Sequence, residues 1–353
     1  MSYDKGFNNP LAIWTAFGGR GNLKRLFEIP SLNWQKLYYY DFGYSSYNSE
    51  RQISVYDNGQ AQIAVYYAKT PYMSYFDKTT GQWTIADVPW WSYGEPQILW
   101  AGDGVFLAKI TGFSNIIASF DGITWHNGGY CENAQNAMTV GAYDAGAGCG
   151  IVSFWYYKSP LYYSYDSLTE RTAWVLVGSD GSSVPVFSSL TAHKGLFVGI
   201  TSSDTEIAKA NPSSPGVWTI TIPEDQDETS YIYLKSVHEK LFVMKWRYID
   251  GTFHVNLCVI NDDATQVTET NLSYVGDLDS NNTPNPQNII WMESWGKYAL
   301  FNEGMLYVSE DGLTWEGVEQ SGLTSNQSFG GAIYVPDDGF YVKGNNCVHY
   351  APY

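Results

Sequence analysis

Pairs of short apolar segments recur along the chain, and each pair is joined by a tight turn that contains glycine or aspartate. Examples are Gln97–Trp100 followed by Val105–Ile110, and Ser188–Ala192 followed by Leu196–Ile200. Short apolar runs bounded by turn residues predict β-strands, and long stretches with the three-and-four spacing of an amphipathic helix are hard to find. The pattern therefore predicts a chain that is almost entirely β.

Two turns share one sequence pattern. Residues 119–125 read SFDGITW and residues 309–315 read SEDGLTW, so both follow S-x-D-G-x-T-W. Each follows a short apolar run and precedes another extended segment, as expected of a hairpin with an Asp-Gly turn. The shared residues are Asp121, Gly122, Thr124 and Trp125 in the first turn and Asp311, Gly312, Thr314 and Trp315 in the second.

Looser copies of this turn place one marker residue at a near-constant interval. The mean spacing is about 47 residues, which matches the roughly 40–50 residues of a four-stranded propeller blade. A pair of apolar segments occurs at the corresponding place before each marker, so the pairs recur at the same interval as the markers. Each unit is therefore expected to hold two strands, a loop, a third strand, the marker turn and a fourth strand. The markers are Trp34, Trp83, Trp125, Trp174, Trp218, Val267 and Trp315.

The predicted fold is an all-β, seven-bladed β-propeller of four-stranded antiparallel blades. The chain starts with an orphan marker, Trp34, and ends with a strand pair that no marker follows. We therefore expect the closing blade to be shared between the N- and C-termini, because a ring leaves no long unpaired sheet edge. Both termini offer a candidate for the third strand of that blade.

The expected domain organisation is an N-terminal arm followed by the propeller. The arm covers residues 1–22 and the propeller residues 23–353. The approximate blades are 50–91, 96–135, 137–180, 184–224, 230–275, 287–320, and 330–353 completed by 23–40.

The two S-x-D-G-x-T-W turns resemble the Asp-box of sialidase-like and related propellers, although they are one residue shorter than the usual S-x-D-x-G-x-T-W form. In particular they are similar to the Asp-box-type repeats of bacteriophage tail and virion proteins. The resemblance implies that the aspartate accepts hydrogen bonds from N–H groups of its own turn and that the tryptophan packs between neighbouring sheets. It implies a structural role, and no catalytic one, for Asp121, Trp125, Asp311 and Trp315.

The net charge limits the classes of partner that the protein is expected to bind. The chain has 36 acidic and 19 basic side chains and a formal net charge of −17. Such a surface repels phosphate groups, so we expect no nucleic-acid partner. We expect no membrane insertion either, because no apolar stretch approaches the roughly 20 residues that span a bilayer. The N-terminus lacks the pattern of a signal peptide. The scattered cysteines predict buried free thiols and assembly in a reducing cytoplasm; they are Cys131, Cys149, Cys258 and Cys347.

The sequence predicts no catalytic site, no metal site and no cofactor. The five histidines form no H-x-x-x-H or H-E-x-x-H pair, and a G-x-S-x-G nucleophile motif is absent. A sialidase needs three arginines that converge on a carboxylate, and the five arginines here are scattered. The acidic segments Glu224–Glu228 and Asp277–Asp279 are expected to be solvated loops, with a weak Ca²⁺ site as the alternative.

Clustered aromatic residues are the candidates for ligand or partner contact. The chain contains 29 tyrosines and 14 tryptophans, more than the contacts between sheets require. Aromatic rings stack on sugars and anchor protein interfaces. The candidates are Trp90, Trp91, Tyr93, Tyr39, Tyr40, Trp155 and Tyr156.

The preferred function is a non-enzymatic phage virion module of the tail, fibre or spike, assembled in the host cytoplasm. It would dock on another structural protein or bind a host surface receptor or glycan, and the arm would anchor it to other virion or tail proteins. One alternative is a free carbohydrate-binding propeller lectin, which should repeat its sugar contacts in each blade. The other is a polysaccharide-degrading glycosidase.

Overall fold

A computed structural model describes the propeller and leaves parts of its loops and the N-terminal region undescribed. The described residues are 32–42, 53–66, 72–86, 96–110, 115–131, 138–155, 161–164, 168, 174–176, 185–223, 229–276, 283–293, 295–302, 304–323, 331–335, 338–344 and 347–352. The predicted arm, residues 1–22, therefore lies outside the described part of the chain.

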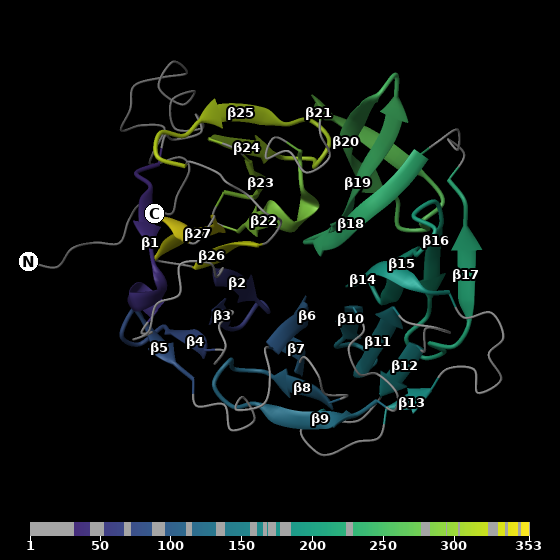
Figure 1. Ribbon diagram of the computed structural model, residues 1–353, viewed down its shortest axis with the longest axis horizontal. Coiled ribbons are helices and arrows are strands. Elements are labelled where there is room, and N and C mark those ends of the chain that lie inside the picture. Colours follow the sequence, from purple (N-terminus) through teal and green to yellow (C-terminus); the bar gives the residue numbers. More distant parts are fainter. Residues whose placement is uncertain are drawn as a thin grey trace, which may run out of the picture.

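Seven four-stranded antiparallel sheets form a ring, as Figure 1 shows. In each of the first six sheets the chain runs from the innermost strand to the outermost strand and then crosses to the next sheet. The only helical elements among the described residues are two short 3-10 turns, η1 (Tyr39–Phe42) and η3 (Pro286–Asn288). The prediction of an all-β, seven-bladed propeller is confirmed.

The first three blades are built from strands of two to seven residues. Blade 1 contains β2 (Ile53–Asp57), β3 (Gln62–Tyr66), β4 (Tyr72–Asp77) and β5 (Gln82–Ile85). Blade 2 contains β6 (Pro96–Gly102), β7 (Val105–Ile110), β8 (Asn115–Ser119) and β9 (His126–Tyr130). Blade 3 contains β10 (Met138–Asp144), β11 (Cys149–Trp155), β12 (Leu161–Ser164) and β13 (Val175–Leu176).

The next three blades include one with unusually long strands. Blade 4 contains β14 (Phe187–His193), β15 (Leu196–Thr201), β16 (Ile207–Ala210) and β17 (Trp218–Thr221). Blade 5 contains β18 (Thr229–Val237), β19 (Lys240–Ile249), β20 (Thr252–Ile260) and β21 (Val267–Gly276), each of nine or ten residues. Blade 6 contains β22 (Ile289–Met292), β23 (Lys297–Asn302), β24 (Met305–Ser309) and β25 (Glu316–Glu319).

The seventh blade joins the two ends of the chain, as predicted. The C-terminal region supplies β26 (Ala332–Val335), β27 (Gly339–Lys343) and β28 (Val348–Pro352), and the N-terminal region supplies the outermost strand, β1 (Gln35–Leu37). β1 pairs antiparallel with β28, with Lys36 opposite His349. The third strand of this blade therefore comes from the C-terminal region, which the sequence left open.

Buried apolar side chains fill the space between adjacent blades. The described residues form seven such clusters, one at each blade-to-blade interface. Between blades 1 and 2, for example, Ile63 and Met73 pack with Phe106 and Trp125. Full burial of one such side chain contributes about 1.5–3 kcal/mol, so the interfaces supply most of the cohesion of the ring.

The two S-x-D-G-x-T-W turns have the same hydrogen-bond pattern. In the second turn, Asp311 Oδ1 accepts from the backbone N–H groups of Leu313 and Thr314, both at 2.8 Å. The indole N–H of Trp315 donates to the carbonyl of Gly312 at 3.1 Å. In the first turn the same bonds join Asp121 to Ile123 and Thr124, and Trp125 to Gly122. Each aspartate thus closes its turn, and each tryptophan is buried at an interface between blades.

The glycine of each turn is required for two reasons. Gly122 has φ +73° and Gly312 has φ +74°, a region in which a side chain is strained. A Cβ atom at Gly122 would also lie 2.6 Å from Cγ2 of Ile63 in the preceding blade. The turn therefore combines a left-handed backbone with close contact to the neighbouring sheet.

All four cysteines are free and buried, as the sequence predicted: Cys131, Cys149, Cys258 and Cys347. Burial raises the pKa of the Cys131, Cys258 and Cys347 thiols, so they are poor nucleophiles. No helix in the described residues is long and apolar enough to cross a membrane.

Replacing the turn aspartate tests the structural role of this motif. Asp311→Ala removes the acceptor of two backbone N–H groups and should lower the free energy of unfolding by about 1–2 kcal/mol, measured by urea denaturation. The neighbouring variant Glu310→Ala is the matched control. Glu310 is 79% exposed and contacts Lys297 at 3.0 Å, so its loss should cost less than about 0.5 kcal/mol.

The Asp311→Ala variant should also change how stability depends on pH. Hydrogen bonds, first that from the Thr314 N–H, hold the pKa of Asp311 below its usual value of 3.8. A depressed carboxyl pKa stabilises the fold above the unfolded-state pKa and ceases to do so as the pH falls through the folded-state value. The stability gap between wild type and Asp311→Ala should therefore narrow below about pH 4. A difference in unfolding free energy that stays constant down to the lowest pH at which both proteins fold would contradict this account.

Candidate functional site

The structure does not describe the side chain of any of the seven aromatic residues that were predicted to contact a ligand or partner. Trp90, Trp91, Tyr93 and Tyr156 lie outside the described residues. Tyr39 and Tyr40 in η1, and Trp155 at the end of β11, are described only as backbone. The acidic segments 224–228 and 277–279 also fall outside the described part. A role for these residues in ligand or partner contact stays a prediction.

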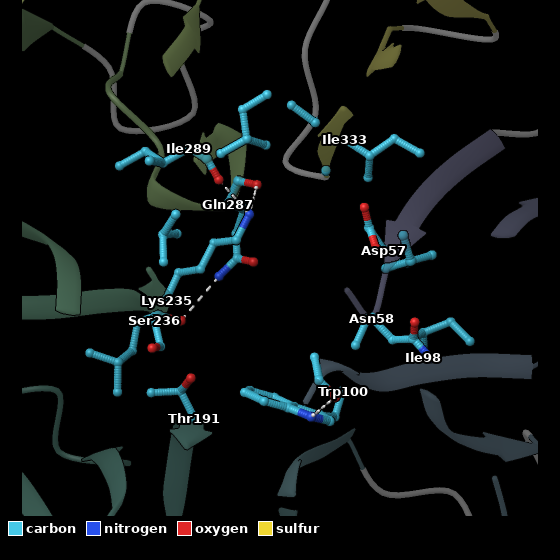
Figure 2. Close-up of a pocket in the computed structure, with 18 of the residues that line it drawn as sticks. Asp57, Asn58, Ile98, Trp100, Thr191, Lys235, Ser236, Gln287, Ile289 and Ile333 are labelled. Atoms are coloured by element: carbon cyan, nitrogen blue, oxygen red, sulfur yellow. Dashed lines mark hydrogen bonds between the residues drawn. The ribbon is translucent and has the colours of Figure 1, made fainter. Parts of the chain in front are cut away.

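A cavity of about 760 Å³ lies at the centre of the ring, where the innermost strands of all seven blades meet. Much of its wall is apolar, and Figure 2 shows the polar side chains that interrupt it, among them Asp57, Thr191, Lys235, Ser236 and Gln287. One wall residue from each inner strand, in chain order, is Val55, Ile98, Val140, Leu190, Lys235, Ile290 and Ile333.

Three of the inner strands carry a β-bulge that faces this cavity. The register shifts between Ile98 and Trp100 in β6, between Phe187 and Ser189 in β14, and between Ile232 and Lys235 in β18. A bulge bends its strand and changes the direction of the side chains beside it. The wall of the cavity is therefore irregular on these three blades.

The bulge in β18 is held from both sides by neighbouring blades. Tyr233 has φ +57°, which breaks the regular strand. The N–H of Leu234 donates to Oγ of Ser189 in blade 4 at 3.0 Å. The carbonyl of Leu234 accepts from Nε2 of Gln287, next to blade 6, at 3.2 Å. The next residue, Lys235, thus leaves a backbone position that two other blades hold in place.

Lys235 places an ammonium group in the wall of the cavity. Its Nζ donates to the carbonyl oxygens of Gln287 and Ile289, each at 2.8 Å (Figure 2). The Ile289 carbonyl belongs to the innermost strand of blade 6, and the Gln287 carbonyl to the turn η3 that precedes it. Burial lowers the pKa of Lys235 to about 8, and the negative charge of Asp57 partly opposes that shift.

Asp57 ends the inner strand of blade 1 and lies across the cavity from Lys235 (Figure 2). Its Oδ1 accepts from the N–H of Gly59 at 2.6 Å, and its Oδ2 accepts from Nε2 of Gln62 at 3.1 Å. Burial raises the pKa of Asp57, although these two hydrogen bonds and the positive charges of Lys78 and Lys235 oppose the shift. Two half-buried opposite charges thus lie on opposite sides of one cavity.

A serine, a histidine and an aspartate meet beside the cavity. Nδ1 of His193, at the end of β14, lies 2.9 Å from Oγ of Ser236, and its Nε2 lies 3.5 Å from Oδ1 of Asp262. In a hydrolytic triad the acid is buried and holds the base. Here Asp262 is 65% exposed and is paired with Lys194 at 2.9 Å. Burial lowers the pKa of His193, so the neutral ring acts as a clamp between blades 4 and 5.

Blade 5 also carries a hairpin that the other blades lack in the described structure. β19 and β20 are joined by Asp250 and Gly251, whose φ values of +51° and +84° match a two-residue hairpin turn. The strands reach past their neighbours at the upper right of Figure 1. Tyr248, Ile249 and, on β21, Val275 are 51%, 41% and 58% exposed.

Aromatic contacts stiffen this hairpin. Phe253 packs against Trp246 and Tyr248, with ring centroids 5.3 Å and 4.9 Å apart. Such pairs stabilise a strand pair beyond the area they bury. The exposed apolar side chains therefore sit on an ordered platform.

Metal ligands do not gather in the described residues: no group of three or more His, Cys, Asp or Glu side chains is placed to hold an ion.

Comparison with known proteins identifies the class of fold. The structure of YCF48 bound to D1 peptide matches with a TM-score of 0.57 and 10% identity, over 93% of this chain and 97% of that chain. A catalytically inactive virginiamycin B lyase from Staphylococcus aureus with quinupristin matches at 0.56 and 9%, over 91% and 99%. An oligogalacturonate lyase from Vibrio parahaemolyticus matches at 0.53 and 8%, over 92% and 97%. The chain is therefore a seven-bladed β-propeller.

No protein-family profile and no curated protein matches the sequence. At 8–10% identity, likeness to the solved structures shows the fold alone. These neighbours include a peptide-bound protein and two lyases, so this shape serves both binding and catalysis.

Sequence reasoning missed both the central charges and the blade 5 hairpin. Lys235 is a single charge within the apolar run Tyr231–Val237, which is a usable sign of an inward-facing polar group. The second strand of blade 5, β19, runs past the apolar segment Leu241–Lys245 and continues to Ile249. The Asp250-Gly251 pair between two extended segments is the signal that could have revealed the hairpin.

The burial of Lys235 predicts a pH dependence of stability. Between about pH 8 and its ordinary pKa of 10.5, the unfolded chain binds more protons at this group than the folded protein does. The contribution of Lys235 to the free energy of unfolding should therefore rise with pH in this window, by about 1–3 kcal/mol. Below about pH 8 the amount by which Lys235 lowers the free energy of unfolding should not change with pH.

Chemical denaturation of wild type and Lys235→Met from pH 7 to about pH 10.5 measures this difference. The variant has no titrating group at this position, so all other titrations cancel in the comparison. Parallel profiles would show that Lys235 is solvated like a surface lysine.

Proposed function

We propose that this chain is a non-enzymatic propeller module of a phage virion, in the tail, fibre or spike, and that it docks on another structural protein or binds a host surface receptor. The resemblance of the turns at 119–125 and 309–315 to Asp-box repeats of virion proteins supports the virion assignment. The peptide held by YCF48 offers a precedent for protein binding by a propeller of this shape.

The hairpin of blade 5 carries the docking part of this proposal. The tip of the hairpin, at Tyr248 and Ile249, lies beyond the strand lengths of the other blades, and neither residue belongs to a buried cluster between blades. The register places exposed Tyr248 on one face of this sheet and the exposed aliphatic side chains of Ile249 and Val275 on the other. Exposed aromatic and aliphatic side chains on an ordered element are typical of protein interface anchors. The net charge of −17 favours a neutral or basic partner surface.

A single protein partner fits these features better than a multivalent lectin. A lectin with equivalent sites would repeat its contact residues from blade to blade. In the described residues, the long strands and the exposed hairpin belong to blade 5 alone. One docking surface therefore accounts for the asymmetry.

The proposed location is the virion, after assembly in the host cytoplasm. The arm, residues 1–22, is the proposed anchor to other virion or tail proteins. The blade 5 hairpin is then a second contact, with a neighbouring subunit or the host.

Labelling of particles tests the proposal. An antibody against the purified protein should mark one end of tailed particles released from the producing cells, as seen by electron microscopy. When the protein is supplied in trans, Ile249→Asp should reduce its incorporation or the attachment of the particles at least tenfold, because a charge enters the apolar contact.

The matched control is Ile85→Asp, at the end of β5. Ile85 is 43% exposed and Ile249 is 41% exposed, so both variants should change stability by less than about 0.5 kcal/mol. Absence of the protein from particles would contradict the virion assignment. Equal behaviour of the two variants would contradict docking through blade 5.

A further inference from the structure

The two charges in the central cavity are each half-buried, and neither makes a direct ion pair. Ion pairs or metal ions usually compensate such groups, because an isolated charge is poorly tolerated away from water. The hydrogen-bond partners of Lys235 are two neutral carbonyls, and those of Asp57 are a backbone N–H and the Gln62 amide. Among the described residues, neither charge is in direct contact with an opposite charge, and Lys78 acts on Asp57 only through its nearby positive charge.

Each of the two groups also keeps hydrogen-bonding capacity that its partners do not use. An ammonium group has three N–H donors, and Lys235 uses two of them on Gln287 and Ile289. The two carboxylate oxygens of Asp57 offer about four acceptor positions, and two are used. Figure 2 shows the two groups on opposite sides of the open space between β18 and β2.

The space between the two charges suits a small molecule with an apolar body. The cavity volume of about 760 Å³ lies within the range of about 300–1,000 Å³ typical of small-molecule sites. Val55, Leu190 and Ile333 supply apolar wall, with Trp100 at the blade 2 side (Figure 2). Hydroxyl groups of Thr191 and Ser236 lie on the Lys235 side.

We infer that the central cavity binds a small zwitterion, a free amino acid or a short peptide, with its carboxylate on Lys235 and its ammonium group on Asp57. The proposal goes beyond the proposed virion function and does not depend on it. A ligand with only one of the two charges would meet an opposite charge on only one side of the cavity. A zwitterion compensates both, and its apolar side chains take the place of water along the apolar wall.

The position of Lys235 indicates a built site. The bulge that directs it into the cavity is held by Ser189 from blade 4 and Gln287 beside blade 6. Bulges frequently lie next to functional sites, where they change the direction of a side chain. Three blades thus cooperate to hold one ammonium group at the centre.

Calorimetric titration of the wild-type chain with leucine, dileucine and trileucine tests the inference. Each added residue separates the terminal charges by about 3.3–3.6 Å, so the length that spans the cavity should bind most tightly. Saturable binding of leucine alone would identify a free amino acid as the ligand class, and binding that improves with length would identify a short peptide.

Blocked forms of the best ligand show which charges are recognised, without altering the protein. The N-acetylated form lacks the ammonium group and the C-terminal amide lacks the carboxylate. Each should bind about tenfold more weakly than the free zwitterion, because a charge-assisted hydrogen bond is lost. Equal binding of the free and blocked forms, or no saturable binding up to about 10 mM, would overturn the inference.

Two variants test which residue of the cavity wall binds which charged group of the ligand. Lys235→Met should weaken binding of the free zwitterion about tenfold and leave binding of the amide unchanged, because the amide has no carboxylate to lose. Asp57→Asn should do the same for the ammonium group, with the acetylated form unaffected. Thermal unfolding of each variant checks that the ring remains intact. If both variants bind all forms as the wild type does, the ligand lies elsewhere and the assignment is wrong.

Discussion

Every sheet of this protein has two apolar faces, and each face is covered only by the next sheet around the ring. The seven buried clusters at the blade interfaces follow from this constraint. An open row of blades would leave two faces bare, so the ring depends on its closure. Closure rests on the short strand β1, on the burial of Trp34 against blade 6, and on Gln320. The side-chain oxygen of Gln320 accepts from Leu32 and from the Trp34 indole.

The same radial arrangement makes the centre of the ring chemically distinctive. Seven inner strands meet there, and each presents a sheet edge with backbone groups that no strand pairs. Lys235 satisfies the carbonyls of Ile289 in β22 and of Gln287 in the adjacent turn η3, and partial burial lowers the pKa of its ammonium group. The bulges in β6, β14 and β18 show that the inner strands depart from regular pairing at this point. The fold thereby concentrates polar groups inside an otherwise apolar channel.

Blade 5 combines both unusual features of the molecule. Its inner strand holds Lys235 and Ser236 at the cavity, and its long β19–β20 hairpin carries exposed Tyr248 and Ile249. The contact of Ser236 with His193 ties this blade to blade 4, and the contact of Gln287 with Leu234 ties it to blade 6. A blade that is held so firmly on both sides can carry an extension without loosening the ring.

The amino-acid sequence by itself determined the number of blades, the strand order within each blade and the sharing of the closing blade, because these follow from local turn chemistry at a regular interval. Asp121 and Asp311 show this most clearly, since each closes its turn with bonds to residues two and three positions away. Only the tertiary structure decided that the third strand of the last blade is β28, that Lys235 faces Asp57 and that His193 meets Ser236. These relations join residues that are far apart in the chain, and their geometry depends on bulges and blade packing that no local pattern encodes.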